Sequence, residues 1–180
     1  MVLARTVLSF IERRDHRLMR RVNRWRAPRW VRYGSLFATR LGDGWLWYAM
    51  APLILVFGGD LRYRALATAS FAALTGILWF KAVKHASHRR RPCDQEPHCW
   101  STLLPPDQFS FPSGHTITAF AIALSLGHLY PQMEPGLLLA AGCIGVSRVL
   151  LGMHFLSDVV AGALFGAGIG YGSFFFFAHF

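Results

Sequence analysis

The segment from residue 61 to residue 83 reads LRYRALATASFAALTGILWFKAV, and it decides the fold class of this chain. Only Arg62, Arg64 and Lys81 carry a charge, and all three lie close to its ends. A helix of about 20 mainly apolar residues is long enough to cross the hydrocarbon core of a bilayer. We therefore predict a transmembrane helix here and an all-α protein that is built into a membrane.

Further apolar runs on both sides of this segment predict a polytopic membrane helical bundle. They cover residues 45–57, 116–129, 137–151 and 154–180. The first run is short for a full crossing and contains Pro52, whereas the polar, proline-rich stretch 84–113 has no run long enough to cross and is predicted to be an extramembrane loop. We expect about five to six transmembrane helices within a membrane-embedded domain that comprises residues 30–180.

The first 29 residues have a different pattern, in which apolar side chains alternate with arginines at helical spacing. The apolar positions are Val7, Leu8, Phe10, Ile11, Leu18, Val22 and Trp25. This pattern is typical of an amphipathic helix that lies at the membrane interface, and Pro28 is expected to end it. An ordinary surface helix packed against the rest of the protein is the alternative explanation for residues 1–29.

The composition narrows the classes of partner. The chain is 53% hydrophobic and 16% charged, with a net charge of +10, which suits nucleic acid, anionic lipid headgroups or a phosphorylated substrate. Apolar runs separate the basic N-terminal segment from the basic stretch 84–91, so no continuous face for nucleic acid is expected. Cys93 and Cys99 share the polar loop, where a disulfide and two reduced thiols are equally compatible with the sequence.

Alternation of the crossings gathers the unusual polar residues at one side of the membrane. The ends of the second and fourth crossings and the starts of the third and fifth carry Lys84, Arg91, His115, Arg148, His154 and Asp158. Each has an ordinary explanation when it is considered alone: snorkelling for the cations, a helix N-cap for Ser113-Gly114-His115, and a structural hydrogen bond for His154 with Asp158. Polar groups gathered at membrane helix ends are nevertheless candidates for a functional site.

Together these residues predict phosphoryl chemistry. Two guanidinium groups, one ammonium group and the amides at a helix start suit the charge of a transferring phosphoryl group. Two imidazoles can attack phosphorus and protonate the leaving oxygen, and Asp158 would accept a hydrogen bond from His154 and so fix its tautomer. His115, His154 and Asp158 could instead bind a metal ion, but the surrounding cations favour an anion, so we expect no metal and no cofactor.

The spacing of these residues resembles a known family signature. Lys84-x6-Arg91-Pro92, Pro112-Ser113-Gly114-His115 and Ser147-Arg148-x5-His154-x3-Asp158 resemble the three-part signature of the type 2 phosphatidic acid phosphatase superfamily, in its membrane lipid phosphatase branch. The resemblance implies that His154 is the nucleophile and forms a phosphohistidine, that Asp158 orients it, and that His115 is the general acid. It further implies that the phosphate is held by Lys84, Arg91, Ser113, Gly114 and Arg148. Membrane members have about six crossings, and the basic segment takes the place of a conventional first one here.

The resemblance also implies a class of substrate without selecting one. Phosphatidic acid, phosphatidylglycerol phosphate and polyprenyl diphosphates are among the family substrates, and we favour a simple phospholipid or isoprenoid phosphate over a sugar-rich one. A phosphotransferase that uses the same phosphohistidine and a non-catalytic phospholipid binder or transporter are the alternatives.

We expect the protein to be integral to a bacterial-type inner membrane. The positive-inside rule would place the arginine-rich N-terminus, and the site with it, in the cytoplasm. Relatives that act on the outer face favour the extracytoplasmic side, which we prefer. The sequence does not predict an oligomeric state.

Overall fold

The computed structural model describes residues 2–95, 100 and 108–178, and it is helical throughout these ranges apart from connecting turns and one isolated bridge between Arg90 and Phe109. The helices are α1 (Val2–Arg24), α2 (Arg29–Arg40), α3 (Leu46–Phe57), α4 (Arg62–Ser87), α5 (Pro92–Gln95), α6 (Gly114–Leu129), α7 (Glu134–Leu150) and α8 (Leu156–Ala178). Short helical turns are η1 (Leu41–Trp45), η2 (Gly59–Leu61) and η3 (Pro131–Met133). The prediction of an all-α fold is confirmed.

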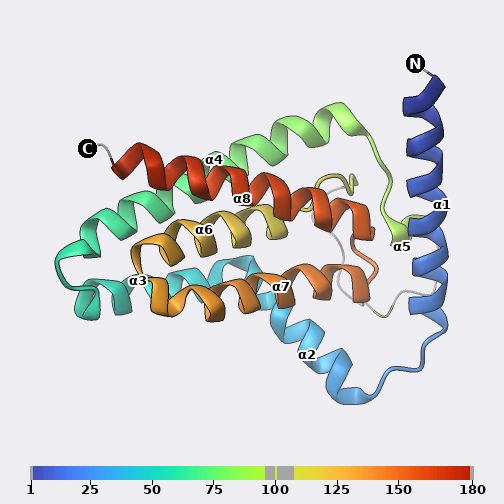
Figure 1. Ribbon diagram of the computed structural model, residues 1–180. Coiled ribbons are helices and arrows are strands. Elements are labelled where there is room, and N and C mark those ends of the chain that lie inside the picture. The colour runs from blue at the N-terminus through green and yellow to red at the C-terminus, as the bar shows by residue number, and fades with distance from the viewer. Residues whose placement is uncertain (1, 96–99, 101–107, 179–180) are drawn as a thin grey trace.

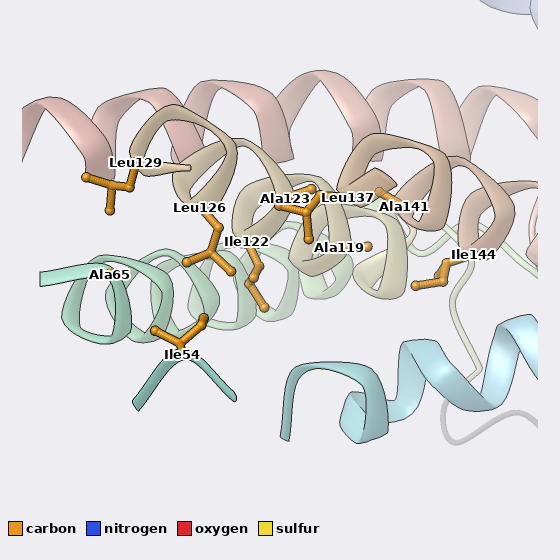
Figure 2. Close-up of a cluster of buried hydrophobic side chains, with 10 residues drawn as sticks. All are labelled: Ile54, Ala65, Ala119, Ile122, Ala123, Leu126, Leu129, Leu137, Ala141 and Ile144. Carbon is orange, nitrogen blue, oxygen red and sulfur yellow. The ribbon is translucent and has the colours of Figure 1, made fainter. Parts of the chain in front are cut away.

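Helix α6 is the centre of the bundle, with α4, α7 and α8 packed around it (Figure 1). Most of its residues are buried, which explains why its sequence is apolar on every face. Figure 2 shows the resulting core, in which Ile122 and Leu126 of α6 pack with Leu137 and Ile144 of α7 and with Ile54 of α3. The ends of α4 and α7 and the starts of α6 and α8 therefore lie at the same end of the bundle (Figure 1).

Small residues bring α8 against α6. A side chain at Gly166 would place its Cβ 2.5 Å from the Ile117 carbonyl oxygen, and one at Gly170 would place its Cβ 2.7 Å from the Ala121 carbonyl oxygen. Real Cβ atoms do not approach backbone that closely, so only glycine allows this separation of the two helices. The close packing fixes the start of α8 beside the start of α6.

Three of the described helical segments are long and apolar enough to cross a membrane. They are Gly59–Ser87, Pro131–Leu150 and Leu156–Ala178, which contain α4, α7 and α8. Helix α6 is apolar but shorter. Three of the predicted crossings, in residues 61–83, 137–151 and 154–180, thus correspond to helices of suitable length.

The connection between α2 and α3 is a kink. The segment η1 between them is wound like a π-helix, but Gly44 within it has non-helical backbone angles, so two helices meet there. Gly44 has φ 114°, a value that side-chain-bearing residues rarely adopt. The chain therefore leaves the helical conformation at Gly44 and changes direction there.

The predicted polar loop is also partly helical. Helix α4 extends into it as far as Ser87, where His88 takes a left-handed φ of 47°, and α5 follows. Cys93 is in α5, whereas Cys99 lies outside the described residues, so the pairing of these two cysteines stays a prediction.

Helix α1 runs across the end of the bundle, at a wide angle to α4, α6 and α8 (Figure 1). Met19 and Val22 of α1 are buried against Val149 of α7 and Phe155 in the connection to α8. Residues 2–24 are therefore helical and pack part of their apolar face on the protein, while a position of this helix at the membrane interface stays a prediction.

Candidate active site

The predicted site residues lie at the end of the bundle that α1 crosses. Lys84 is in the last turn of α4, Arg91 precedes α5, Ser113 precedes α6, Gly114 and His115 begin α6, Arg148 is in the last turn of α7, His154 is in the α7–α8 connection, and Asp158 is in the first turn of α8. All except His115 are buried. The structure thus brings together the helix ends that alternation of the crossings predicted.

Backbone hydrogen bonds shape the loop that carries His154. The N–H groups of Met153 and His154 both donate to the carbonyl of Arg148, at 3.0 and 3.1 Å. Nδ1 of His154 lies 2.7 Å from the carbonyl oxygen of Ser110, so Nδ1 carries the hydrogen and Nε2 keeps its lone pair. Nη1 of Arg91 lies 3.3 Å from that Nε2. The unprotonated nitrogen therefore faces a guanidinium group.

The surroundings of His154 disfavour its protonated form. Burial, followed by the positive charges of Arg148, Arg91 and Lys84, holds the pKa of His154 well below its usual value. The ring is consequently neutral at neutral pH, and its Nε2 lone pair stays available.

Asp158 is placed differently from the prediction that it accepts a hydrogen bond from His154. Its Oδ2 lies 3.7 Å from Nδ1, beyond hydrogen-bond distance, because Nδ1 is occupied by the Ser110 carbonyl. Oδ2 instead accepts from the Phe155 N–H at 2.8 Å, and Oδ1 accepts from Nη1 of Arg89 at 2.5 Å. Asp158 therefore fixes the backbone that follows His154, not the imidazole itself.

The start of α6 forms the opposite wall of the site. The Ser113 N–H donates to the carbonyl of Asp158 at 3.2 Å, which joins this turn to α8. A Cβ at Gly114 would lie 3.0 Å from the ring of Phe80 on α4, so the turn is also held closely from the other side. The first amides of a helix have no partner inside the helix, which makes such a start a site for anions.

Two further cations have contacts that hold them in place, one from another helix and one from its own helix. A guanidinium nitrogen of Arg148 donates to the hydroxyl of Thr39, which is buried on α2. The ammonium of Lys84 lies 5.5 Å from the centre of the Phe80 ring. Cations held in place, in a largely buried site, stabilise an anion without reorganising first.

His115 has a partner that the sequence analysis missed. Its Nε2 lies 2.8 Å from Oδ1 of Asp43, which belongs to η1, and the other oxygen of Asp43 lies 3.7 Å from Arg40. The contact depends on the kink at Gly44, which the sequence did not predict. An acidic residue between two glycines in an otherwise apolar stretch was the available signal.

A cavity of about 320 Å³ opens beside His115. Its wall is mostly apolar and comes from Trp47 of α3, Ile77 of α4 and Ile122 of α6, while Asp43 and His115 line its polar part. The site can therefore hold a molecule that joins an apolar group to an anion.

Comparison with known proteins agrees with this architecture. The family model described as the PAP2 superfamily matches residues 61–179. The chain belongs to this superfamily. The lipid A 1-phosphatase of Rhizobium johnstonii is 30% identical to this PAP2 chain over 162 residues, which cover 79% of the chain and 66% of the relative. The chain thus spans just under two thirds of that relative's length.

Two further relatives are similar over most of this PAP2 chain. The decaprenylphosphoryl-5-phosphoribose phosphatase of Mycobacterium tuberculosis is 32% identical over 127 residues, covering 71% of the chain and 68% of the relative. The crystal structure of LpxE from Aquifex aeolicus superposes with a TM-score of 0.71 at 30% identity, covering 87% of the chain and 92% of that structure. The bundle therefore has the fold of the LpxE structure over most of both chains.

Proposed function

We propose that this protein is an integral membrane phosphatase that hydrolyses a lipid phosphate or diphosphate through a phosphohistidine on His154. The observation that carries the proposal is the hydrogen bond between Nδ1 of His154 and the Ser110 carbonyl, which leaves Nε2 unprotonated beside Arg91. A neutral imidazole whose lone pair faces a cationic site can attack a bound phosphate. Anion binding alone would not require this arrangement.

The reaction has two steps in this proposal. The Nε2 lone pair of His154 forms a bond to phosphorus as the bond to the lipid oxygen breaks, and His115 donates a proton to that oxygen. A water oxygen then bonds to phosphorus as the Nε2–P bond breaks, His115 accepts the water's proton, and inorganic phosphate leaves. Throughout, Arg91, Arg148 and Lys84, with the Ser113 hydroxyl and the Gly114 amide, would balance the charge on the phosphoryl oxygens.

The apolar cavity beside His115 supports a lipid as the leaving group. Phosphatidic acid, phosphatidylglycerol phosphate and polyprenyl diphosphates fit this chemistry, and we favour a simple phospholipid or isoprenoid phosphate. The name of the Rhizobium johnstonii relative adds a lipid A 1-phosphate to the substrates that should be tested.

We further propose that α3, α4, α6, α7 and α8 cross an inner membrane and that α1 lies in its interface. The wide angle between α1 and the bundle supports this placement, since a helix across the end of transmembrane helices is close to the membrane plane (Figure 1). The catalytic end would face the extracytoplasmic side, as the family resemblance favours.

Phosphate release by the purified protein in detergent, with EDTA present, tests the proposal. The substrates are phosphatidic acid, phosphatidylglycerol phosphate, undecaprenyl diphosphate and lipid A 1-phosphate, each also assayed with His154→Ala. Release that EDTA does not affect, that vanadate inhibits and that is lost in the variant is the expected result. Release that persists in His154→Ala would refute the phosphohistidine, and release that needs an added acceptor would favour a phosphotransferase.

A further inference from the structure

Helix α1 carries a buried acid on its apolar face. Asp15 lies on the same side of the helix as Met19 and Val22, and all three are buried. A carboxylate in such a position is costly unless it has close partners. Its partners therefore show what α1 is attached to.

Asp15 contacts the catalytic end of the bundle at two residues. Its Oδ2 accepts from Nη2 of Arg89 at 2.7 Å and also from the Ser157 hydroxyl. Its Oδ1 accepts from the Ser157 N–H at 3.2 Å. The same guanidinium donates through Nη1 to Asp158 at 2.5 Å and to the Ser157 hydroxyl at 2.7 Å. Arg89 thus joins a carboxylate of α1 to a carboxylate of α8.

This chain of contacts reaches the residue that follows the predicted nucleophile. Asp158 accepts from the N–H of Phe155, the residue after His154. The ring of Phe155 is held from the same direction, because the Arg89 guanidinium lies 4.3 Å from its centre and the His16 ring lies 5.0 Å away. The position of the His154 loop therefore depends on groups that α1 fixes.

We infer that Asp15 is a positioning residue for His154, acting through Arg89 and Asp158, so that α1 contributes to the geometry of the active site through this one residue. The inference rests on the proposed function. Without the Asp15 carboxylate, one edge of the Arg89 guanidinium loses its partner, and the side chain is free to rotate away from Asp158. The loop that presents Nε2 is then held less firmly, and small displacements of a reacting group cost rate.

The test compares Asp15→Asn, Arg89→Gln and the double variant by steady-state kinetics and by single-turnover formation of the radiolabelled phosphoenzyme. We expect Asp15→Asn to lower kcat about tenfold and to leave KM within about twofold, since Asp15 does not touch the substrate. The double variant should lose no more than Arg89→Gln alone, because residues that act through one another are not additive. In Asp15→Asn the phosphoenzyme should form more slowly than in wild type. The amount formed per mole of protein should be the same as in wild type, because this amount measures the fraction of correctly folded sites.

Glu12→Gln is the matched control, because it removes the same charge from an exposed position one turn earlier on α1, and it should keep the wild-type rate. The inference would be overturned by a wild-type kcat in Asp15→Asn or by additive losses in the double variant. It would also be overturned if Asp15→Asn formed less phosphoenzyme but formed it at the wild-type rate. If wild type itself releases no phosphate from any lipid, the proposed function fails instead.

Discussion

His154 is oriented by a backbone carbonyl, and this detail changes what is expected of Asp158. A substitution that forces the wrong tautomer on a catalytic histidine costs about 10⁴-fold in rate. Here the Ser110 carbonyl, not Asp158, accepts from Nδ1, so Asp158→Asn leaves the tautomer intact and loosens only the loop. We expect kcat of Asp158→Asn to fall roughly 10- to 100-fold, measured by phosphate release. A loss as complete as that of His154→Ala would show that the carboxylate bonds the imidazole during the reaction.

Asp43 leads to a prediction about the leaving group. If it orients His115 for proton donation, Asp43→Asn should slow hydrolysis of a lipid phosphate, whose alkoxide needs a proton, by about tenfold. The same variant should release nitrophenolate from p-nitrophenyl phosphate in the first turnover at the wild-type rate, because nitrophenolate leaves without a proton from His115. Asp60→Asn, in the turn η2 after α3, is the control and should affect neither substrate. Equal losses on both substrates would assign Asp43 to folding.

The sequence could predict the site residues with distinctive spacing and not those defined by tertiary contacts. His115, His154 and the signature cations follow from fixed intervals along the chain. Arg89, by contrast, is one of three consecutive arginines, and only the folded structure distinguishes it from Arg90. Asp15 is separated from Arg89 by 74 positions, so no local pattern could join them.

Among the helices, α8 gives the clearest prediction about stability. Gly166 and Gly170 face α6, and Gly168 faces no atom within 4 Å. Gly166→Ala should lower the free energy of unfolding by about 1–3 kcal/mol, because its Cβ would press on the Ile117 carbonyl and force the helices apart. Gly168→Ala is the matched control and should cause no loss. Thermal unfolding in detergent measures both, and equal stability of the two variants would contradict the close packing of α8 on α6.

The long apolar helices could be predicted from the sequence, whereas the connection between α2 and α3 could not. Long apolar runs predicted α4, α7 and α8 well, since the solvent around them is uniformly apolar and imposes one conformation. Gly42 and Gly44 indicate a break between α2 and α3, but a glycine-flanked aspartate is compatible with both a turn and a kink, so the form of the break was not predicted. Packing of Gly42 against His115 and Ile144, where a Cβ would come within 3.1 and 2.8 Å, favours the kink.

For the whole molecule, the proposed placement of α1 in the membrane interface would relate the membrane surface to the proposed catalytic end. Arginines cover its outer face, including the exposed Arg13, Arg17 and Arg24, whereas Asp15 faces the bundle. Basic residues near a surface of anionic lipid gain about 1 kcal/mol each. Binding of this face to headgroups should therefore press α1 onto the bundle and hold Arg89 against Asp158.

Turnover in vesicles should then depend on their charge. We expect a severalfold higher kcat in phosphatidylglycerol vesicles than in phosphatidylcholine vesicles, and the difference should shrink at high salt, which screens surface charges. The triple variant Arg13→Gln, Arg17→Gln, Arg24→Gln should lose this dependence, while Arg62→Gln, at the opposite end of the bundle, should keep it. If the triple variant responds to anionic lipid like wild type, α1 does not act through the membrane surface, and its contribution is confined to the contacts of Asp15 within the protein.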